Sequence, residues 1–405
     1  MKKRIFKTNI RHGNNMSFRE IRDMAKGNPG AFVQTITDAA EKGQLRFSDI
    51  PDLKELYRYT ADVLVPVNMT DISGAERAIK ASAFPILTGT LAIAGIQEAY
   101  DAVPSIGQDL VTEMDDNKKI TTLVNLETLD KEVDEVKELD DFPEVGVTED
   151  YVEIRHKRNG RKLTISAEAI EENDAPNIIA RINKLGEIMG EWEEEQTLQR
   201  VTDHYGSGSA PTEPYAYRPS GTGTQLYNAT ANNPGTRAPS GTRVTSNALE
   251  DETDIDNART VLAAMKNGRG KRIFIPWSDV YCLVPYAVVG KASKVFNSEY
   301  VPGVENEMSN YGPVGRWHIP PERLLTTPKL DDLSTSAWYL GAFKRQFVRK
   351  WKLRVEYVTL GQDTQAYLNS RVAFQARIAW DMEVGATDYV YVVQNLSATT
   401  APVDE

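Results

Sequence analysis

The stretch between residues 151 and about 203 constrains this fold most, because it places a basic two-stranded ribbon directly before one long helix. Apolar and polar residues alternate on both sides of Asn159-Gly160, a dipeptide that signals a hairpin turn because both residues tolerate positive φ. We predict a β-hairpin over residues 151–165 with its turn at 158–160. An isolated two-stranded hairpin is only marginally stable in water, so this ribbon is expected to be stabilised against another surface.

The helix is predicted from about residue 175 to 203. Asn173-Asp174 are candidates for its N-cap, and Pro176 suits the first turn, where a missing N–H costs nothing. Apolar residues then recur in steps of four and three, at Ile178, Ile182, Leu185, Met189 and Trp192, and less regularly at Leu198 and Val201. This single narrow apolar stripe is typical either of an ordinary core helix or of a strut, roughly 40 Å long, that contacts neighbouring molecules.

The predicted ribbon and the predicted helix carry opposite charges. The ribbon is rich in lysine and arginine, whereas the helix carries the acidic cluster Glu191, Glu193, Glu194 and Glu195. In an ordinary core helix these acids would form one solvated face. If neighbouring copies of the chain meet here, the two surfaces are complementary. The residues predicted at such inter-subunit contacts are Arg155, Lys157, Arg158, Arg161, Lys162, Glu191, Glu194 and Glu195.

Composition excludes several classes of protein. A formal net charge of −11 over 405 residues argues against general polyanion binding, which depends on lysine and arginine. The basic segment at residues 2–11 is either a solvated tail or a contact with nucleic acid or another subunit. No apolar run is long enough to cross a membrane, and no signal-peptide core is present, so we expect a cytoplasm-like compartment. Cys282 stands alone among apolar residues, which predicts a buried, inert thiol.

Motifs for catalysis and cofactor binding are incomplete. Residues 268–271 resemble a phosphate-binding loop, but Met265 replaces its first glycine and Arg272 the Ser or Thr after its lysine. The acids within residues 251–256 suit a helix N-terminus better than a calcium loop, which needs a glycine for its sharp turn. We therefore predict no catalytic residue, no cofactor and no metal, although an enzyme whose active-site residues come from distant segments stays an open alternative.

The order of predicted elements indicates an α+β fold rather than repeated βαβ units. A Gly-, Ser- and Thr-rich connector at residues 205–247 is expected to be exposed. Short buried segments are predicted at 272–275 and 281–284, a helix at 288–296, and strands near 351–357, 372–380 and 389–393.

Four segments, in their order along the chain, carry a resemblance to a known family. They are residues 83–111, Leu163–Glu172, Ser336–Gly341 and Phe374–Asp381. Over roughly residues 80–395 the chain resembles the major capsid proteins of tailed bacteriophages, which have the Hong Kong 97-type fold. The resemblance implies an N-terminal helical region and arm at 1–125, an extended loop at 126–166, a peripheral domain with a spine helix and inserted loop at 167–248, an axial domain at 249–350, strands returning to the peripheral domain at 351–395, and a tail at 396–405.

The resemblance also implies a function. The chain would be a structural, non-enzymatic head protein that forms hexamers and pentamers of an icosahedral shell around double-stranded DNA, without sequence-specific binding. It would be located in the virion after assembly in the host cytoplasm, with scaffold, portal and decoration proteins as potential partners and no membrane contact. The alternative is an encapsulin-like nanocompartment shell that encloses protein cargo.

Two processing steps known in this family are also considered. Some members cross-link their subunits through a lysine and an asparagine. Lys157, Lys162 and Asn159 lie near the relevant loop but do not match that pattern, so we expect no cross-link. Others lose an N-terminal scaffolding segment, whereas here residues 1 to about 65 are expected to be retained.

Overall fold

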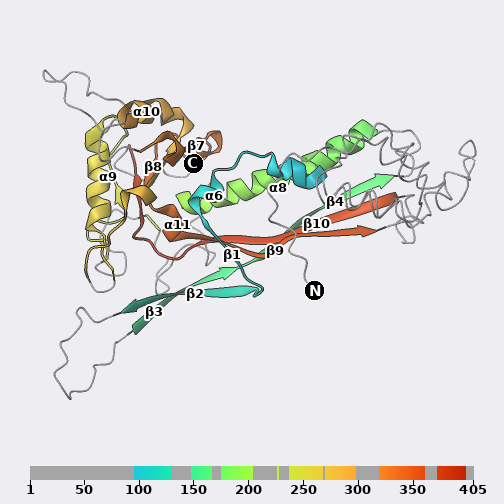
Figure 1. Cartoon of the computed structure of the whole chain (residues 1–405), viewed down its shortest axis with the longest axis horizontal. Helices are drawn as coiled ribbons and strands as arrows, with labels where there is room; N and C mark the ends of the chain where they lie inside the picture. The colour runs from blue at the N-terminus through green and yellow to red at the C-terminus, as the bar shows by residue number, and fades with distance from the viewer. Residues whose placement is uncertain are drawn as a thin grey trace, which may run out of the picture. The chain divides into compact units, whose positions relative to one another are not determined.

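The computed structural model describes residues 95–128, 147–166, 175–203, 226–227, 237–267, 270–297, 319–360 and 372–397 (Figure 1). Helices and strands are mixed along the chain, which confirms the predicted α+β class. The chain divides into two compact units. One is formed by residues 1–104, 158–192 and 353–380, and the other by residues 105–157, 193–352 and 381–405.

The described helices include one that is much longer than the others. It is α8 (Ala175–Thr202), and the shorter α-helices are α6 (Gly107–Leu110), α9 (Glu252–Ala264), α10 (Val289–Asn297) and α11 (Phe343–Gln346). Residues 95–101 are also helical. Short 3-10 helices lie at Trp277–Asp279, Tyr286–Val288, Pro321–Arg323 and Pro328–Leu330.

The described strands form three sheets. A four-stranded sheet has the order β1 (Thr112–Asp115), β9 (Phe347–Leu360), β10 (Val372–Ala386) and β4 (Lys157–Ser166). A five-stranded sheet has the order β5 (Arg243–Val244), β11 (Val392–Asn395), β8 (Trp338–Gly341), β6 (Tyr281–Pro285) and β7 (Leu324–Thr327). The third sheet pairs β2 (Ile120–Thr128) with β3 (Val147–Arg155).

Helix α8 confirms the prediction of a long helix to within one residue at its C-terminal end. Ile182, Met189, Leu198 and Val201 of the predicted stripe are buried, and Leu185 and Trp192 are half-buried. The proposed caps, Asn173-Asp174, lie outside the described residues.

The predicted hairpin turn at residues 158–160 is wrong. Asn159-Gly160 lies inside β4, which is hydrogen-bonded to β10, and β3 pairs instead with β2. A Cβ atom on Gly160 would lie 2.6 Å from the carbonyl oxygen of Ile378. The glycine therefore allows a close approach of two backbones within a sheet, which is a second common reason for glycine in a strand. A two-stranded ribbon does form, but its strands are β2 and β3, which carry more acidic than basic residues. The basic residues lie mostly on β4, which follows the ribbon at His156.

The five-stranded sheet contributes buried apolar residues from β6, β8 and β11. Cys282 is completely buried in β6, as predicted, and burial raises the pKa of its thiol. Strand β6 and helix α10 confirm the elements predicted there, while the strand predicted at 389–393 lies at Val392–Asn395. Asp251 caps α9 and Asp254 completes a capping box, which confirms the interpretation of these acids as a helix N-terminus.

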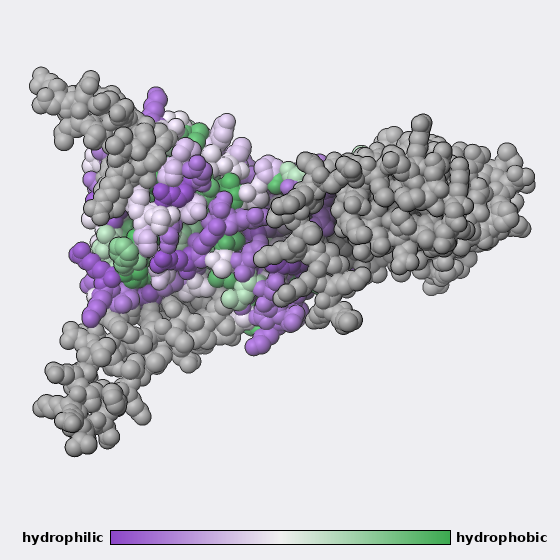
Figure 2. All heavy atoms as spheres, in the orientation of Figure 1, coloured by the Kyte–Doolittle hydropathy of each residue, from purple (hydrophilic) through white to green (hydrophobic). Residues whose placement is uncertain are grey.

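Two predictions of exposure or burial are wrong. The described part of the connector at 205–247 is largely buried, because Arg237 forms an ion pair of 2.8 Å with Asp388 and β5 pairs with β11. Conversely, Phe274 in the segment predicted to be buried is 83% exposed. On the face of the molecule drawn in Figure 2, the coloured surface is mostly hydrophilic, and apolar residues form small separate groups.

Candidate functional site

The cations predicted at an inter-subunit contact lie at and beyond the junction of β3 and β4. Arg155 ends β3 and Lys157 begins β4. Arg158, Arg161 and Lys162 are exposed on β4. These five residues are therefore placed at the end of β3 and along β4, on either side of His156, rather than around a hairpin tip.

The acidic residues of α8 separate into two groups. Glu191 and Glu195 are exposed, whereas Glu193 and Glu194 are 5% and 1% exposed. The alternative that all four acids form one solvated face is therefore wrong for Glu193 and Glu194. Glu194, which we predicted at an inter-subunit contact, has its carboxylate bonded within the chain.

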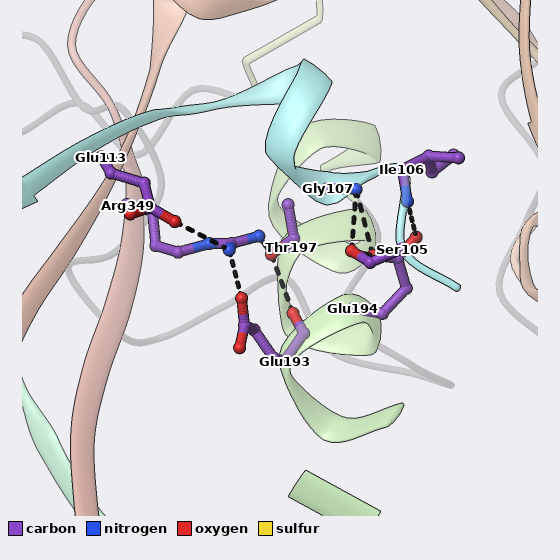
Figure 3. A network of polar contacts seen from close by, with 8 residues as sticks. All are labelled: Ser105, Ile106, Gly107, Glu113, Glu193, Glu194, Thr197 and Arg349. Atoms are coloured by element: carbon purple, nitrogen blue, oxygen red, sulfur yellow. Dashed lines mark hydrogen bonds and ion pairs between the residues drawn. The ribbon is translucent and has the colours of Figure 1, made fainter. Parts of the chain in front are cut away.

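The carboxylate of Glu193 is paired with a fully buried guanidinium (Figure 3). Arg349 of β9 contacts Glu193 through Nη1 and donates a hydrogen bond of 2.9 Å from Nη2 to Oγ1 of Thr197. The Thr197 hydroxyl in turn donates to the Glu193 carbonyl at 2.8 Å. Glu113, which is opposite Arg349 in the parallel pairing of β1 with β9, lies 3.6 Å from the same guanidinium. We call these four residues the Arg349 network.

Glu194 binds the segment that precedes α6. Its Oε1 accepts a hydrogen bond of 3.1 Å from the Ile106 amide, and its Oε2 accepts one of 3.1 Å from the Gly107 amide and another from the Ser105 hydroxyl. A Cβ atom on Gly107 would lie 2.6 Å from Nη2 of Arg349 and 2.9 Å from Oε2 of Glu194. Only glycine allows the chain to pass between the two side chains without displacing one of them.

These contacts make a structural junction rather than an active site. The Glu193 carboxylate faces a buried guanidinium and that of Glu194 accepts three donors, so neither is placed as a free acid or base. Breaking a buried ion pair by removing one partner typically costs about 3–5 kcal/mol, because the other charge is left buried and unpaired. The junction therefore fixes α8, β9 and the segment before α6 to one another.

The opposite face of β9 carries a second polar group. Successive side chains of a strand point to opposite faces, so Lys350 points away from Arg349. Lys350 is 1% exposed, and its Nζ lies 3.5 Å from Oδ2 of Asp116, which also accepts from the Thr121 hydroxyl. These bonds lower the pKa of Asp116 to about 2, the hydrogen bond from Thr121 being the largest cause. Burial lowers the pKa of Lys350.

His156 lies beside this pair and is 7% exposed. Burial is the main cause that lowers the pKa of His156, and the nearby charge of Lys350 lowers it further. We call His156, Asp116, Thr121 and Lys350 the His156 cluster.

Sequence reasoning missed both groups, since their members come from distant segments. Glu193 and Arg349 are 156 residues apart, and Ser105 and Glu194 are 89 apart. One signal was available. From Met189, steps of four along the apolar stripe reach Glu193, Thr197 and Val201, so the polar Glu193 and Thr197 occupy core positions of the helix.

Comparison with models of known protein families shows which family the chain belongs to. A family model for phage capsid proteins matches residues 150–399, which is more than half of the sequence. The chain belongs to the phage capsid protein family. The resemblance seen in the order of sequence segments is thus confirmed at the level of the family. No curated protein sequence matches this chain significantly.

The solved structures that match this chain include several capsids. The capsid of cyanophage P-SCSP1u is 12% identical, with a TM-score of 0.46 over 74% of this chain and 89% of that chain. The mature capsid of bacteriophage PhiM1 is 12% identical, with a TM-score of 0.43 over the same shares of both chains. A virus-like particle from Pyrococcus furiosus is 9% identical, with a TM-score of 0.41 over 75% of this chain and 96% of that chain. These scores lie below 0.5, so family membership rests on the sequence match.

Two further observations concern this capsid family member. Among the described residues, no group of three His, Cys, Asp or Glu side chains is arranged to hold a metal ion. No helix in the described ranges combines the length and apolar character needed to span a membrane.

Proposed function

We propose that this protein is the major capsid protein of a tailed bacteriophage, with the Hong Kong 97-type fold. Its copies assemble into hexamers and pentamers that close an icosahedral shell around double-stranded DNA in the virion, after assembly in the host cytoplasm. The observation that carries this proposal is the match of the phage capsid family over residues 150–399. The role is structural, and the pairing of the buried Glu193 and Glu194 with donors supports a non-catalytic chain.

In this proposal α8 is the spine helix, and the β2–β3 ribbon with the following β4 is the extended loop. A ribbon of two strands has little area in which to bury apolar side chains, so a neighbouring copy supplies the missing contact. Closed symmetric shells provide every subunit with such a neighbour.

We further propose that β4 and α8 of adjacent copies meet through opposite charges. Arg158, Arg161 and Lys162 are the exposed cations of β4. Glu191 and Glu195 are exposed one helical turn apart, on the same face of α8. Glu194 is left out of this contact, since its carboxylate is bonded within the subunit.

Electron microscopy of the purified full chain tests the shell. We expect closed particles built from rings of six and five subunits, and monomers or small rings under all conditions would contradict the proposal. Particles isolated from host cells should protect DNA from nuclease. Shells that contain protein cargo and no DNA would instead indicate a nanocompartment.

Charge reversal tests the contact. The triple change of Arg158, Arg161 and Lys162 to Glu should prevent particle formation, while the same change at the exposed Lys271, Arg272 and Lys294 alters net charge equally and should be tolerated. Adding Glu191→Lys and Glu195→Lys to the first variant should restore particles. Normal assembly of the first variant would contradict the electrostatic contact, and blocked assembly without restoration would place the partner of β4 elsewhere.

A further inference from the structure

Two backbone hydrogen bonds outside the strand ladders lie at the base of the β2–β3 ribbon. The His156 amide donates a hydrogen bond of 3.1 Å to the carbonyl of Lys119, next to the last strand pair, Ile120 with Arg155. The Asp116 amide donates one of 2.8 Å to the carbonyl of Trp351 in β9. His156 is thus the residue at which the chain leaves the ribbon and enters β4.

The imidazole of His156 is buried in an unusual state. Its side chain is enclosed, and within the described part of the chain neither Nδ1 nor Nε2 has a hydrogen-bond partner. Buried polar side-chain atoms in native proteins are mostly hydrogen-bonded, so such an exception calls for a physical reason. Other neutral side chains of similar size would fill this position without two unsatisfied nitrogens.

Charged groups face this ring from three elements. Lys350 and Lys352 come from β9, Asp116 follows β1, and Asp381 comes from β10. The two lysines lower the pKa of His156 and the two aspartates raise it, but burial is the largest cause and lowers it. The ring therefore resists protonation more than an exposed histidine does, and among the described residues neither ring nitrogen has a hydrogen-bond partner in the closed site.

We propose that His156 is a pH-sensitive latch, which holds the base of the β2–β3 ribbon closed while its buried ring is neutral and opens it when the ring is protonated. An imidazolium has two N–H donors, and in the closed site the described residues supply a hydrogen-bond partner to neither. Opening exposes the ring to water, which satisfies both donors.

The sign of the pH effect follows from the lowered pKa. A histidine exposed by opening takes up a proton near its ordinary value of about 6.5, whereas the closed site takes it up only at lower pH. The closed state therefore loses stability relative to the open state as pH falls below about 6.5. If the closed ring stays neutral, the open-to-closed ratio rises about tenfold between pH 7.5 and pH 5.5.

Hydrogen exchange on the purified full chain measures this opening. After correction for the intrinsic effect of pH, amides of the ribbon base around residues 119–121 and 154–156 should lose protection at pH 5.5 relative to pH 7.5, by at most about tenfold. Amides of β6 and β8 should not change and serve as the internal control. Equal protection of the ribbon base at both pH values would overturn the proposal.

Two neutral substitutions, His156→Gln and His156→Phe, test the residue itself. Both should remove the pH dependence of exchange at the ribbon base, and a dependence equal to that of the wild type would overturn the proposal. Lys350→Met should reduce the effect, because a nearby positive charge that lowers the pKa of His156 is removed.

If neither His156 variant folds, the latch is tested by measuring the pKa of His156 in the wild type, using nuclear magnetic resonance titration. A pKa of His156 below 6.5 supports the latch, and one at or above 6.5 overturns it. None of these measurements requires a shell to form.

Discussion

Arg349 and Lys350 are neighbours in β9 and both are buried, yet their surroundings differ. On one face, the guanidinium of Arg349 is matched by the carboxylate of Glu193 and the hydroxyl of Thr197. On the other, the ammonium of Lys350 has a longer contact with the partly exposed Asp116 and lies near a histidine whose side chain has no hydrogen-bond partner among the described residues.

The comparison shows how one strand can serve two purposes. Arginine offers several donors in a fixed plane, which suits a buried junction with defined geometry. Lysine is a single charge on a flexible stem, and its pKa shifts readily on burial. The Arg349 network is therefore suited to hold elements in place, whereas the His156 cluster is suited to respond to a proton. Substitutions in and beside the two groups test this contrast.

The largest effect is expected for Arg349→Met. The variant leaves Glu193 buried without its cation and should lower the free energy of unfolding by about 3–5 kcal/mol. Lys350→Met should cost under about 1.5 kcal/mol, because Asp116 keeps its other hydrogen bonds and its side chain is 20% exposed. Denaturant titration measures both values. Adding Glu193→Gln to Arg349→Met should recover part of the loss, and equal costs for Arg349→Met and Lys350→Met would refute the contrast.

A smaller effect is expected for Gly107→Ala. The added methyl group would meet Arg349 and Glu194 at less than 3 Å, so one side chain must move, at a cost of about 1–3 kcal/mol. Gly290→Ala in α10 is the matched control, since a Cβ there meets nothing within 4 Å and alanine favours a helix by up to about 1 kcal/mol. The two variants should therefore move the unfolding midpoint in opposite directions, and a shift in the same direction would contradict the packing at Gly107.

The smallest effect concerns Asp116 and pH. Because the folded pKa of Asp116 is lowered to about 2, its contribution to stability is complete above the unfolded value near 4 and is lost as pH falls through about 2. The wild type should exceed Asp116→Asn in unfolding free energy at pH 6, and the difference should shrink at pH 3. Solvent screening keeps this difference small. A difference that is the same at both pH values would show that the charge of Asp116 does not stabilise the fold.

Local patterns in the sequence were sufficient for the long elements. The helix at α8 was predictable because Pro176 marks its start and apolar residues repeat with helical spacing. Strands β6 and β10 were predictable from their apolar or alternating residues. The turn at Asn159-Gly160 was not, because the same dipeptide suits a turn and a close approach of strands, and only the position of β10 decides between them.

The Arg349 network and the His156 cluster could not be predicted from local sequence patterns, for a related reason. A carboxylate is assumed to be exposed unless a partner is known, and the partners of Glu193 and Glu194 are distant in sequence. The same holds for His156, whose burial depends on β9 and on the loop after β1. What the sequence did offer was the position of Glu193 on the apolar stripe of α8.

The burial of Cys282 gives this chain a natural reporter. It is the single cysteine in the sequence, it lies within the five-stranded sheet, and its raised pKa keeps the thiol protonated. Because the thiolate is the reactive form, a thiol reagent can modify the chain only when this sheet opens. The rate of labelling therefore measures how often the sheet opens, in free subunits and in assembled particles alike, without any engineered probe.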